Sequence, residues 1–184
     1  MADKGLSRPG CRVQRGWGWT FCFFFLACWV IFLSGHEASL AATSYGENFS
    51  AQVVKVIDGD TIEVRCQEKK LRIRLWGIDT PEHQQGFSRE AQEFTRQRIQ
   101  GRGVELQTKA WDKYGRLVAI VSVDGDSLNE ELLREGLAWV HISYCKEPIC
   151  REWRQLEKKA RQGGRGLWQD THPVPPWKWK QNHR

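Results

Sequence analysis

Residues 51–76 decide the fold, and they read AQVVKVIDGDTIEVRCQEKKLRIRLW. β-Branched residues and alternating polarity mark three strand-like runs in this stretch, at 51–57, 61–66 and 71–76. The connection Asp58-Gly59-Asp60 is typical of a hairpin turn, because Gly supplies the backbone freedom that such a turn needs. The stretch therefore predicts a three-stranded antiparallel meander.

Two strands and three helices are predicted after this meander. The strands cover 104–110 and 117–123, and the helices cover 88–100, 128–135 and 149–161. The middle helix has the clearest boundaries, because Ser127 and Glu130 form a capping box before it and Gly136 ends it. This order favours a β-barrel with helices (α+β), namely a five-stranded OB-fold barrel with three α-helices.

The composition fits one folded domain with appendages. The chain has 184 residues, of which 40% are hydrophobic and 27% charged, and this excludes wholesale disorder. The sequence has no repeat with a period of roughly 20–50 residues, which excludes a solenoid or a propeller. The net charge of +6 permits an anionic partner without identifying one.

Residues 1–41 have the layout of a targeting segment. Basic residues precede an uncharged, largely apolar stretch at 16–35, and Ser39 and Ala41 supply the small residues of a signal-peptidase site. This order predicts a secretory signal peptide. The alternative is an uncleaved signal anchor, because 16–35 is long enough to tether the protein to a membrane. Either way the domain is expected outside the cytosol, as a secreted, periplasmic or membrane-anchored protein.

Three cysteines follow the leader, at Cys66, Cys145 and Cys150. The compartment expected for the domain favours disulfides. Because Cys145 and Cys150 flank a short loop, we expect a bridge between these two and a buried thiol at Cys66. A zinc site that includes His141 is the alternative, but a fourth ligand is missing.

Residues 42–49 are expected to form a linker and 169–184 a flexible tail on either side of the domain, 50–168. Because the tail has adjacent prolines and scattered charged residues, it is not expected to contribute to a hydrophobic core. Its alternation WKWK at 177–180 suits stacking on nucleic acid or contact with membrane headgroups, and a solvated tail without a task is the alternative.

Three carboxylates lie where the predicted meander would bring them together. Asp60 begins the second strand, Asp79 follows the third, and Glu82 comes shortly after. Clustered carboxylates repel one another and raise their own pKa values unless a cation lies among them. Because oxygen ligands favour hard ions, the cluster indicates Ca²⁺ or Mg²⁺ rather than Zn²⁺.

Two arginines complete the candidate site. Arg74 lies on the third strand, and Arg116 follows a predicted turn at the start of the fifth. Guanidinium groups beside a carboxylate-bound dication grip phosphate oxygens and offset the charge of a five-coordinate transition state. With a carboxylate to accept a proton from water, this set describes phosphodiester hydrolysis.

Three motifs resemble those of the staphylococcal nuclease (thermonuclease) family. They are VIDGDTI at 56–62, RIRLWGIDTPE at 72–82 and DKYGRL at 112–117. A weaker fourth block runs from 129 to 138. The resemblance extends from about Ser50 to Trp168, which is nearly all of the expected domain.

The resemblance implies an OB-fold barrel and a secreted, Ca²⁺-dependent nuclease that acts on DNA and RNA and leaves 3′-phosphate ends. No obligate protein partner is implied. By motif, Asp60, Asp79 and the backbone carbonyl of Thr80 would bind Ca²⁺. The residues matching the catalytic positions are Arg74, Glu82 and Arg116, and those matching substrate contacts are Lys113, Tyr114 and Tyr144.

One departure and one alternative remain. The family's type member has a second tyrosine near Tyr144, where this chain has none, and Trp139 is a candidate substitute for base stacking. The alternative function is a non-catalytic OB-fold module that only binds nucleic acid. The complete set of five charged catalytic positions favours the enzyme.

Overall fold

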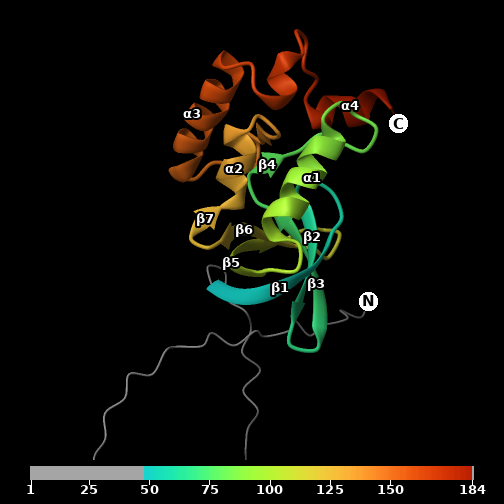
Figure 1. Cartoon of the computed structure of the whole chain (residues 1–184), viewed down its shortest axis with the longest axis vertical. Coiled ribbons are helices and arrows are strands. Elements are labelled where there is room, and N and C mark those ends of the chain that lie inside the picture. The colour runs from blue at the N-terminus through green and yellow to red at the C-terminus, as the bar shows by residue number, and fades with distance from the viewer. Residues whose placement is uncertain (1–47, 184) are drawn as a thin grey trace, which may run out of the picture.

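The computed structural model describes residues 48–183 (Figure 1). The predicted signal peptide or anchor and nearly all of the predicted linker lie outside the described residues. No helix in the described part is long and apolar enough to cross a membrane.

Five long strands form a closed barrel. They are β1 (Asn48–Val56), β2 (Thr61–Cys66), β3 (Lys69–Leu75), β5 (Gly103–Trp111) and β6 (Leu117–Val123). Neighbouring strands pair antiparallel in the order β3-β2-β1-β5-β6, and a parallel contact between β3 and β6 closes the barrel. The predicted five-stranded OB-fold barrel is therefore confirmed, including its opening meander.

Three short strands were not predicted, because two residues are too few to show a periodic pattern. They are β4 (Ile78–Asp79), β7 (Asp126–Ser127) and β8 (Trp139–Val140). The antiparallel pair β4–β8 matters for the site, since it places Asp79 opposite Trp139. Asp79 thus lies in a strand of its own after the Gly77 turn.

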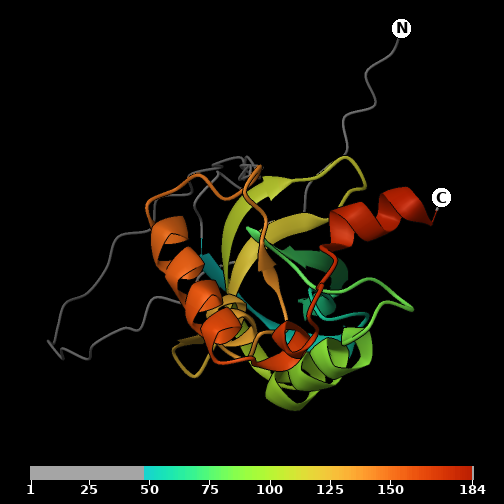
Figure 2. The ribbon, with the colours of Figure 1, turned by 90° about the horizontal axis from the view of Figure 1, so that it is seen from above.

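The three predicted helices are present with nearly the predicted boundaries: α1 (Ser88–Ile99), α2 (Leu128–Arg134) and α3 (Ile149–Gln162). The Glu130 amide donates to the Ser127 side chain at 3.4 Å, as expected for the N-cap of α2. A 3₁₀ helix, η1 (Gly166–Gln169), and a fourth helix, α4 (Pro176–Asn182), follow α3. Figure 2 shows α3 and α4 on opposite sides of the barrel.

The core fills the barrel and continues under α2. Fully buried side chains include Ile62, Ile73 and Leu106 from the strands and Leu132 from α2. Burying each such side chain contributes about 1.5–3 kcal/mol. Asn129 is a polar side chain buried with them: it accepts from the Val121 amide and donates to the Trp76 carbonyl, so it joins α2 to two parts of the barrel.

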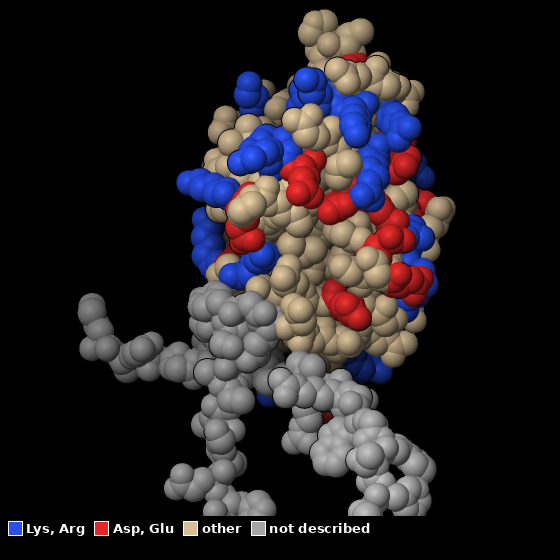
Figure 3. Space-filling view, turned by 90° about the vertical axis from the view of Figure 1, so that its left-hand side faces the viewer, with Lys and Arg blue, Asp and Glu red and all other residues tan. Residues whose placement is uncertain are grey.

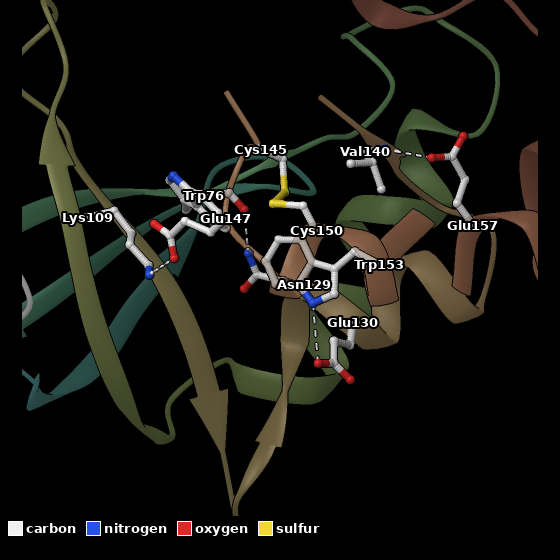
Figure 4. Close-up of a disulfide and its surroundings, with 10 residues drawn as sticks. All are labelled: Trp76, Lys109, Asn129, Glu130, Val140, Cys145, Glu147, Cys150, Trp153 and Glu157. Carbon is white, nitrogen blue, oxygen red and sulfur yellow. Dashed lines mark hydrogen bonds and ion pairs between the residues drawn. A yellow bond between two sulfur atoms is a disulfide. The ribbon is translucent and has the colours of Figure 1, made fainter. Parts of the chain in front are cut away.

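The predicted Cys145–Cys150 disulfide is confirmed and packs against Trp153, whose ring meets that of Trp76 edge-on (Figure 4). The bridge joins the loop after β8 to the first turn of α3. The expectation of a thiol at Cys66 is wrong, because Cys66 also takes part in a disulfide.

The prediction of a flexible tail is wrong. Pro175 and Pro176 open helix α4 instead of preventing one, because the fixed φ of proline suits the first turn of a helix. Pro176 is buried, and Trp177 packs on a small apolar cluster formed by Trp139, Ala160, Leu167 and Trp168. The last part of the described chain is therefore folded onto the domain.

The face of the molecule that carries α3 has a mixed charge pattern. Figure 3 shows Lys and Arg side chains on this face interrupted by Asp and Glu. On α3 itself, Arg161 donates to Glu157, whose carboxylate also accepts from the Val140 amide. The face does not form an unbroken basic track.

Candidate active site

The turn between β1 and β2 brings Asp60 to one end of the barrel. The amide of Ile57 donates to the Thr61 carbonyl at 2.9 Å, and the Asp60 amide donates to the Asp58 side chain at 3.0 Å. A Cβ on Gly59 would lie 2.8 Å from Thr80 Oγ1 and 2.9 Å from Ala91. Glycine is needed here because the turn approaches the next loop and α1 so closely.

Asp60 and Thr80 are joined by two hydrogen bonds across the barrel end. Asp60 Oδ2 accepts from the Thr80 amide at 2.7 Å and from Thr80 Oγ1 at 2.9 Å. Both residues are buried. The loop after β4 is thus fixed to the start of β2, and the motifs at 56–62 and 72–82 meet at this end of the barrel.

Arg74 lies between the two aspartates. Its Nη1 lies 3.2 Å from Asp60 Oδ2, and its Nη2 lies 2.5 Å from Asp79 Oδ1. Nη1 also donates to the Leu75 carbonyl at 2.9 Å. The structure therefore brings Asp60, Asp79, Thr80 and Arg74 together, from three separate segments of the chain.

This cluster carries more negative than positive charge. Burial, with the neighbouring charge of Asp60, raises the pKa values of Asp58 and Asp79 above their ordinary range. Burial acts to lower the pKa of Arg74, but Asp60 and Asp79 outweigh it and raise that pKa. One guanidinium does not balance three aspartates, so the site favours a further cation.

The residues present fit a hard metal ion. The two carboxylates of Asp60 and Asp79 and the backbone carbonyl of Thr80 are oxygen donors, which Ca²⁺ and Mg²⁺ prefer. Within the described residues, no three His, Cys, Asp or Glu side chains are arranged to hold a metal. Two carboxylates and one carbonyl leave the other coordination positions to water and substrate oxygens, which suits a catalytic ion.

Glu82 lines a pocket of about 350 Å³ beside this cluster. Asp58, Asp60 and Thr80 line the same pocket, and α1 contributes Ser88, Arg89 and Gln92. The Glu82 amide donates to Gln85 Oε1 at 2.9 Å, and Glu82 Oε1 lies 2.6 Å from Lys180 Nζ on α4. The candidate base is thus placed at the pocket and in contact with the C-terminal helix.

Arg116 is held differently from Arg74. Its Nε donates to Asp112 Oδ2 at 2.7 Å, while its own amide and that of Tyr114 donate to Asp112 Oδ1. Burial acts to raise the pKa of Asp112, but these hydrogen bonds outweigh it and lower that pKa. Arg116 directly precedes β6, whose Val118 pairs with Arg74 on β3, so Arg116 lies at the start of the strand adjacent to that of Arg74. Its ion pair is nevertheless with Asp112, not with the aspartates of the cluster.

The predicted substrate contacts lie on the surface. Lys113 and Tyr114 are exposed on the turn before Arg116, with the Lys113 ammonium 5.1 Å from the Tyr114 ring centre. Tyr144 is 70% exposed, and its ring lies 4.5 Å from that of His141. Trp139 is wrong as a stacking substitute, because it is only 3% exposed and packs against Trp168.

Three residues at the site were not singled out by sequence reasoning: Asp58, Gln85 and Lys180. Asp58 could have been found, since it lies in the same turn as Asp60. Gln85 and Lys180 gave no local signal, because their roles depend on contacts between the loop after β4 and the end of the chain.

Comparison with known proteins identifies the family of the chain. The family described as staphylococcal nuclease homologue matches residues 72–170. An "uncharacterized endonuclease" of Escherichia coli O157:H7 is 40% identical over 130 residues, covering 70% of this chain and 83% of the relative. The "micrococcal nuclease" of Shigella flexneri is 32% identical over 142 residues, covering 72% of this chain and 81% of the relative.

A plant protein named "staphylococcal-like nuclease CAN1", from Arabidopsis thaliana, is 36% identical over 116 residues, which is 63% of this chain and 35% of that protein. The match to the family, the closed barrel and the acidic cluster with Arg74 point the same way. The chain belongs to the staphylococcal nuclease family and is a nuclease-type hydrolase of nucleic acid.

Proposed function

We propose that this protein is a Ca²⁺-dependent nuclease that works outside the cytosol and hydrolyses phosphodiester bonds of DNA and RNA, leaving 3′-phosphate ends. The observation that carries the proposal is the convergence of Asp60, Asp79 and Arg74 beside the pocket that Glu82 lines. The choice of Ca²⁺ as the ion and of 3′-phosphate ends as the products comes from the sequence resemblance, and nucleases of this family are generally metal-dependent.

Asp60, Asp79 and the Thr80 carbonyl would hold the ion, which when bound polarises a phosphoryl oxygen and offsets developing charge. Glu82 accepts a proton from the attacking water or orients that water. Its contact with Lys180 is through Oε1, at 2.6 Å. A positioned base of this kind contributes about 10²–10⁴-fold to the rate.

The two arginines stabilise charge on the phosphate. Arg74 is a fixed cation at the pocket side of the barrel. Arg116 uses Nε for Asp112, which leaves its two terminal amino groups to donate to phosphate oxygens. Lys113, Tyr114 and Tyr144 are exposed and could contact the strand on either side of the scissile bond.

Two observations support a location outside the cytosol. The first is the leader pattern at 1–41, with small residues at a signal-peptidase site. The second is the Cys145–Cys150 disulfide, since such bonds persist in oxidising compartments. A tether through 16–35 is the alternative to cleavage, and cell fractionation with N-terminal sequencing of the mature protein distinguishes the two.

The test is hydrolysis of denatured DNA and of RNA by the purified protein, with Ca²⁺, with Mg²⁺ and with chelator. We expect cleavage with Ca²⁺, none in chelator, and products that a polymerase extends only after phosphatase treatment. Glu82→Gln should lower the rate by about 10²–10⁴-fold, while Glu90→Gln, a matched change at an exposed position on α1, should not.

The outcomes separate the candidate functions. Nucleic-acid binding without hydrolysis under any metal would make the protein a binding module and end the enzyme proposal. Undiminished cleavage in chelator would remove the ion from the mechanism, and equal rates for Glu82→Gln and Glu90→Gln would show that the base lies elsewhere.

A further inference from the structure

The C-terminal segment 171–183 contacts the active-site loop, residues 80–87 between β4 and α1, at several points. Lys180 on α4 forms the 2.6 Å ion pair with Glu82, and the Val174 carbonyl accepts from Gln85 Nε2 at 2.5 Å. Figure 1 shows α4 next to the loop that leads into α1. The sequence motif WKWK thus lies at the active site, although nothing in the proposed reaction uses it.

Gln85 links the segment to the backbone of Glu82. Its Oε1 accepts from the Glu82 amide, and its Nε2 donates to Val174, so one buried side chain joins the loop and the tail. Lys180 adds a second tie, on the carboxylate itself. The distant segment therefore contacts the Glu82 side chain directly, through Lys180, and its main chain indirectly, through Gln85.

Apolar packing fixes the segment in place. Trp177 of α4 and Phe87 of the active-site loop pack on the same cluster, formed by Trp139, Ala160, Leu167 and Trp168. The Trp177 ring also lies 5.1 Å from that of His141. Because the loop and the tail share these contacts, displacing the tail would loosen the support of the loop.

Glu82 needs such support because it lies outside the helices and strands, in the connection between β4 and α1. Side chains on loops are less precisely placed than those on regular elements, and small misplacements of a base cost much of the rate. The ion pair between Lys180 and Glu82 Oε1 limits the rotamers of Glu82.

We propose that residues 171–183 form a positioning element of the active site, in which Lys180 and Gln85 hold Glu82 ready to act on water. This inference rests on the proposed function, because it assigns Glu82 the role of base. Lys180 is a positioning residue in this scheme and need not touch the substrate.

The main experiment compares Lys180→Ala, Lys180→Arg and Lys178→Ala in the full chain. Lys178 is exposed on the same helix, so the control removes an equal charge without touching Glu82. We expect kcat of Lys180→Ala to fall about tenfold with KM within about twofold of wild type, as for a displaced base. Lys180→Arg should restore most of kcat, and Lys178→Ala should match wild type.

A second variant tests the same element without assaying activity. In Gln85→Ala the Glu82 amide loses its acceptor and Val174 loses its donor, so we expect faster amide hydrogen exchange in 80–87 and in 174–183. The barrel strands should keep wild-type protection. Unchanged exchange in both segments would contradict the coupling between loop and tail.

Other kinetic outcomes overturn the proposal in identifiable ways. A raised KM with unchanged kcat would make Lys180 a phosphate contact, and a higher kcat/KM would make it an inhibitory contact. An equal decrease of kcat in Lys180→Ala and Lys178→Ala would show that the effect comes from the lost positive charge alone and not from the contact with Glu82. If wild type shows no metal-dependent hydrolysis, the proposed function fails first, and the exchange experiment still decides whether the tail supports the loop.

Discussion

Arg74 and Arg116 are both cations at barrel strands that pair with each other, yet the protein holds them in different ways. Arg74 is 15% exposed and contacts two other segments of the chain, through Asp60 and Asp79, as well as the Leu75 carbonyl of its own strand. Arg116 is 27% exposed and forms its ion pair within its own turn, with Asp112. The first is part of the tertiary structure, whereas the second is a local arrangement on the surface.

Because of this difference, substitutions at the two arginines should affect the stability of the protein and the hydrolysis reaction to different extents. Removing a buried cation leaves the carboxylates around it buried without a counter-charge, which lowers the free energy of unfolding, whereas exposed ion pairs contribute little to that free energy. We therefore expect changes at Arg74 to affect both the fold and the reaction, and changes at Arg116 to affect the reaction almost alone. Four predictions follow this contrast.

Arg74→Ala should have the largest effect. Asp60 and Asp79 would remain buried without their cation, so the free energy of unfolding should fall by about 3–5 kcal/mol in urea denaturation. Hydrolysis should be undetectable. Arg72→Ala, at an exposed position on the same strand, is the control and should change stability by less than about 0.5 kcal/mol. Equal stability of the two variants would mean that Arg74 is not a structural cation.

Arg116→Lys should lower kcat/KM by about 10²–10³-fold, because a point charge replaces a fork that donates to two phosphate oxygens. Its free energy of unfolding should stay within about 1 kcal/mol of wild type. Steady-state kinetics on denatured DNA and urea denaturation of the same preparation check both parts. A loss of stability as large as that of Arg74→Ala would show that Arg116, like Arg74, is needed for the folded structure.

Adding Ca²⁺ should stabilise the protein against heat, since an ion bound only by the folded state shifts the equilibrium by about 2.7 kcal/mol at 100 times its Kd. Arg116→Lys should keep this shift in Tm, because Arg116 lies outside the acidic cluster. Asp79→Asn should lose most of it. Differential scanning calorimetry with and without chelator measures the shift, and an equal shift in Asp79→Asn would move the ion away from that carboxylate.

Asp112→Asn should have the smallest effect of the four. The amide oxygen can still accept from the turn amides, but the charge that orients Arg116 is lost. We expect a decrease in kcat/KM of about tenfold, in line with a misplaced catalytic group. In the background of Arg116→Lys the same change should add little, and full additivity of the two effects would show that Asp112 does not act through Arg116.

The sequence was enough to predict the barrel and the acidic cluster, because both depend on local patterns. Alternating strands around the turn at 58–60 place Asp60, and the motif at 72–82 carries Arg74 and Asp79 on the next strand. The register Thr61↔Arg74 then follows from the meander. Local pattern and tertiary structure agree here: the barrel is confirmed, and Asp60 and Asp79 both contact Arg74.

The C-terminal helix was not predictable by the same reasoning. Pro175 and Pro176 read as a break in structure, although proline also suits a helix start. The contact between Lys180 and Glu82 joins residues that are distant in the sequence and depends on how Trp177 packs. No short-range pattern encodes such a contact.

The parallel contact between β3 and β6 has a consequence for how the enzyme matures. It pairs Ile73 with Leu117, which are far apart in the chain, and such non-local pairing is slow to form during folding. The same contact sets the two arginine-bearing strands side by side. A partly folded chain can therefore contain every active-site residue without an assembled active site, and we expect nuclease activity to appear only after the barrel has closed.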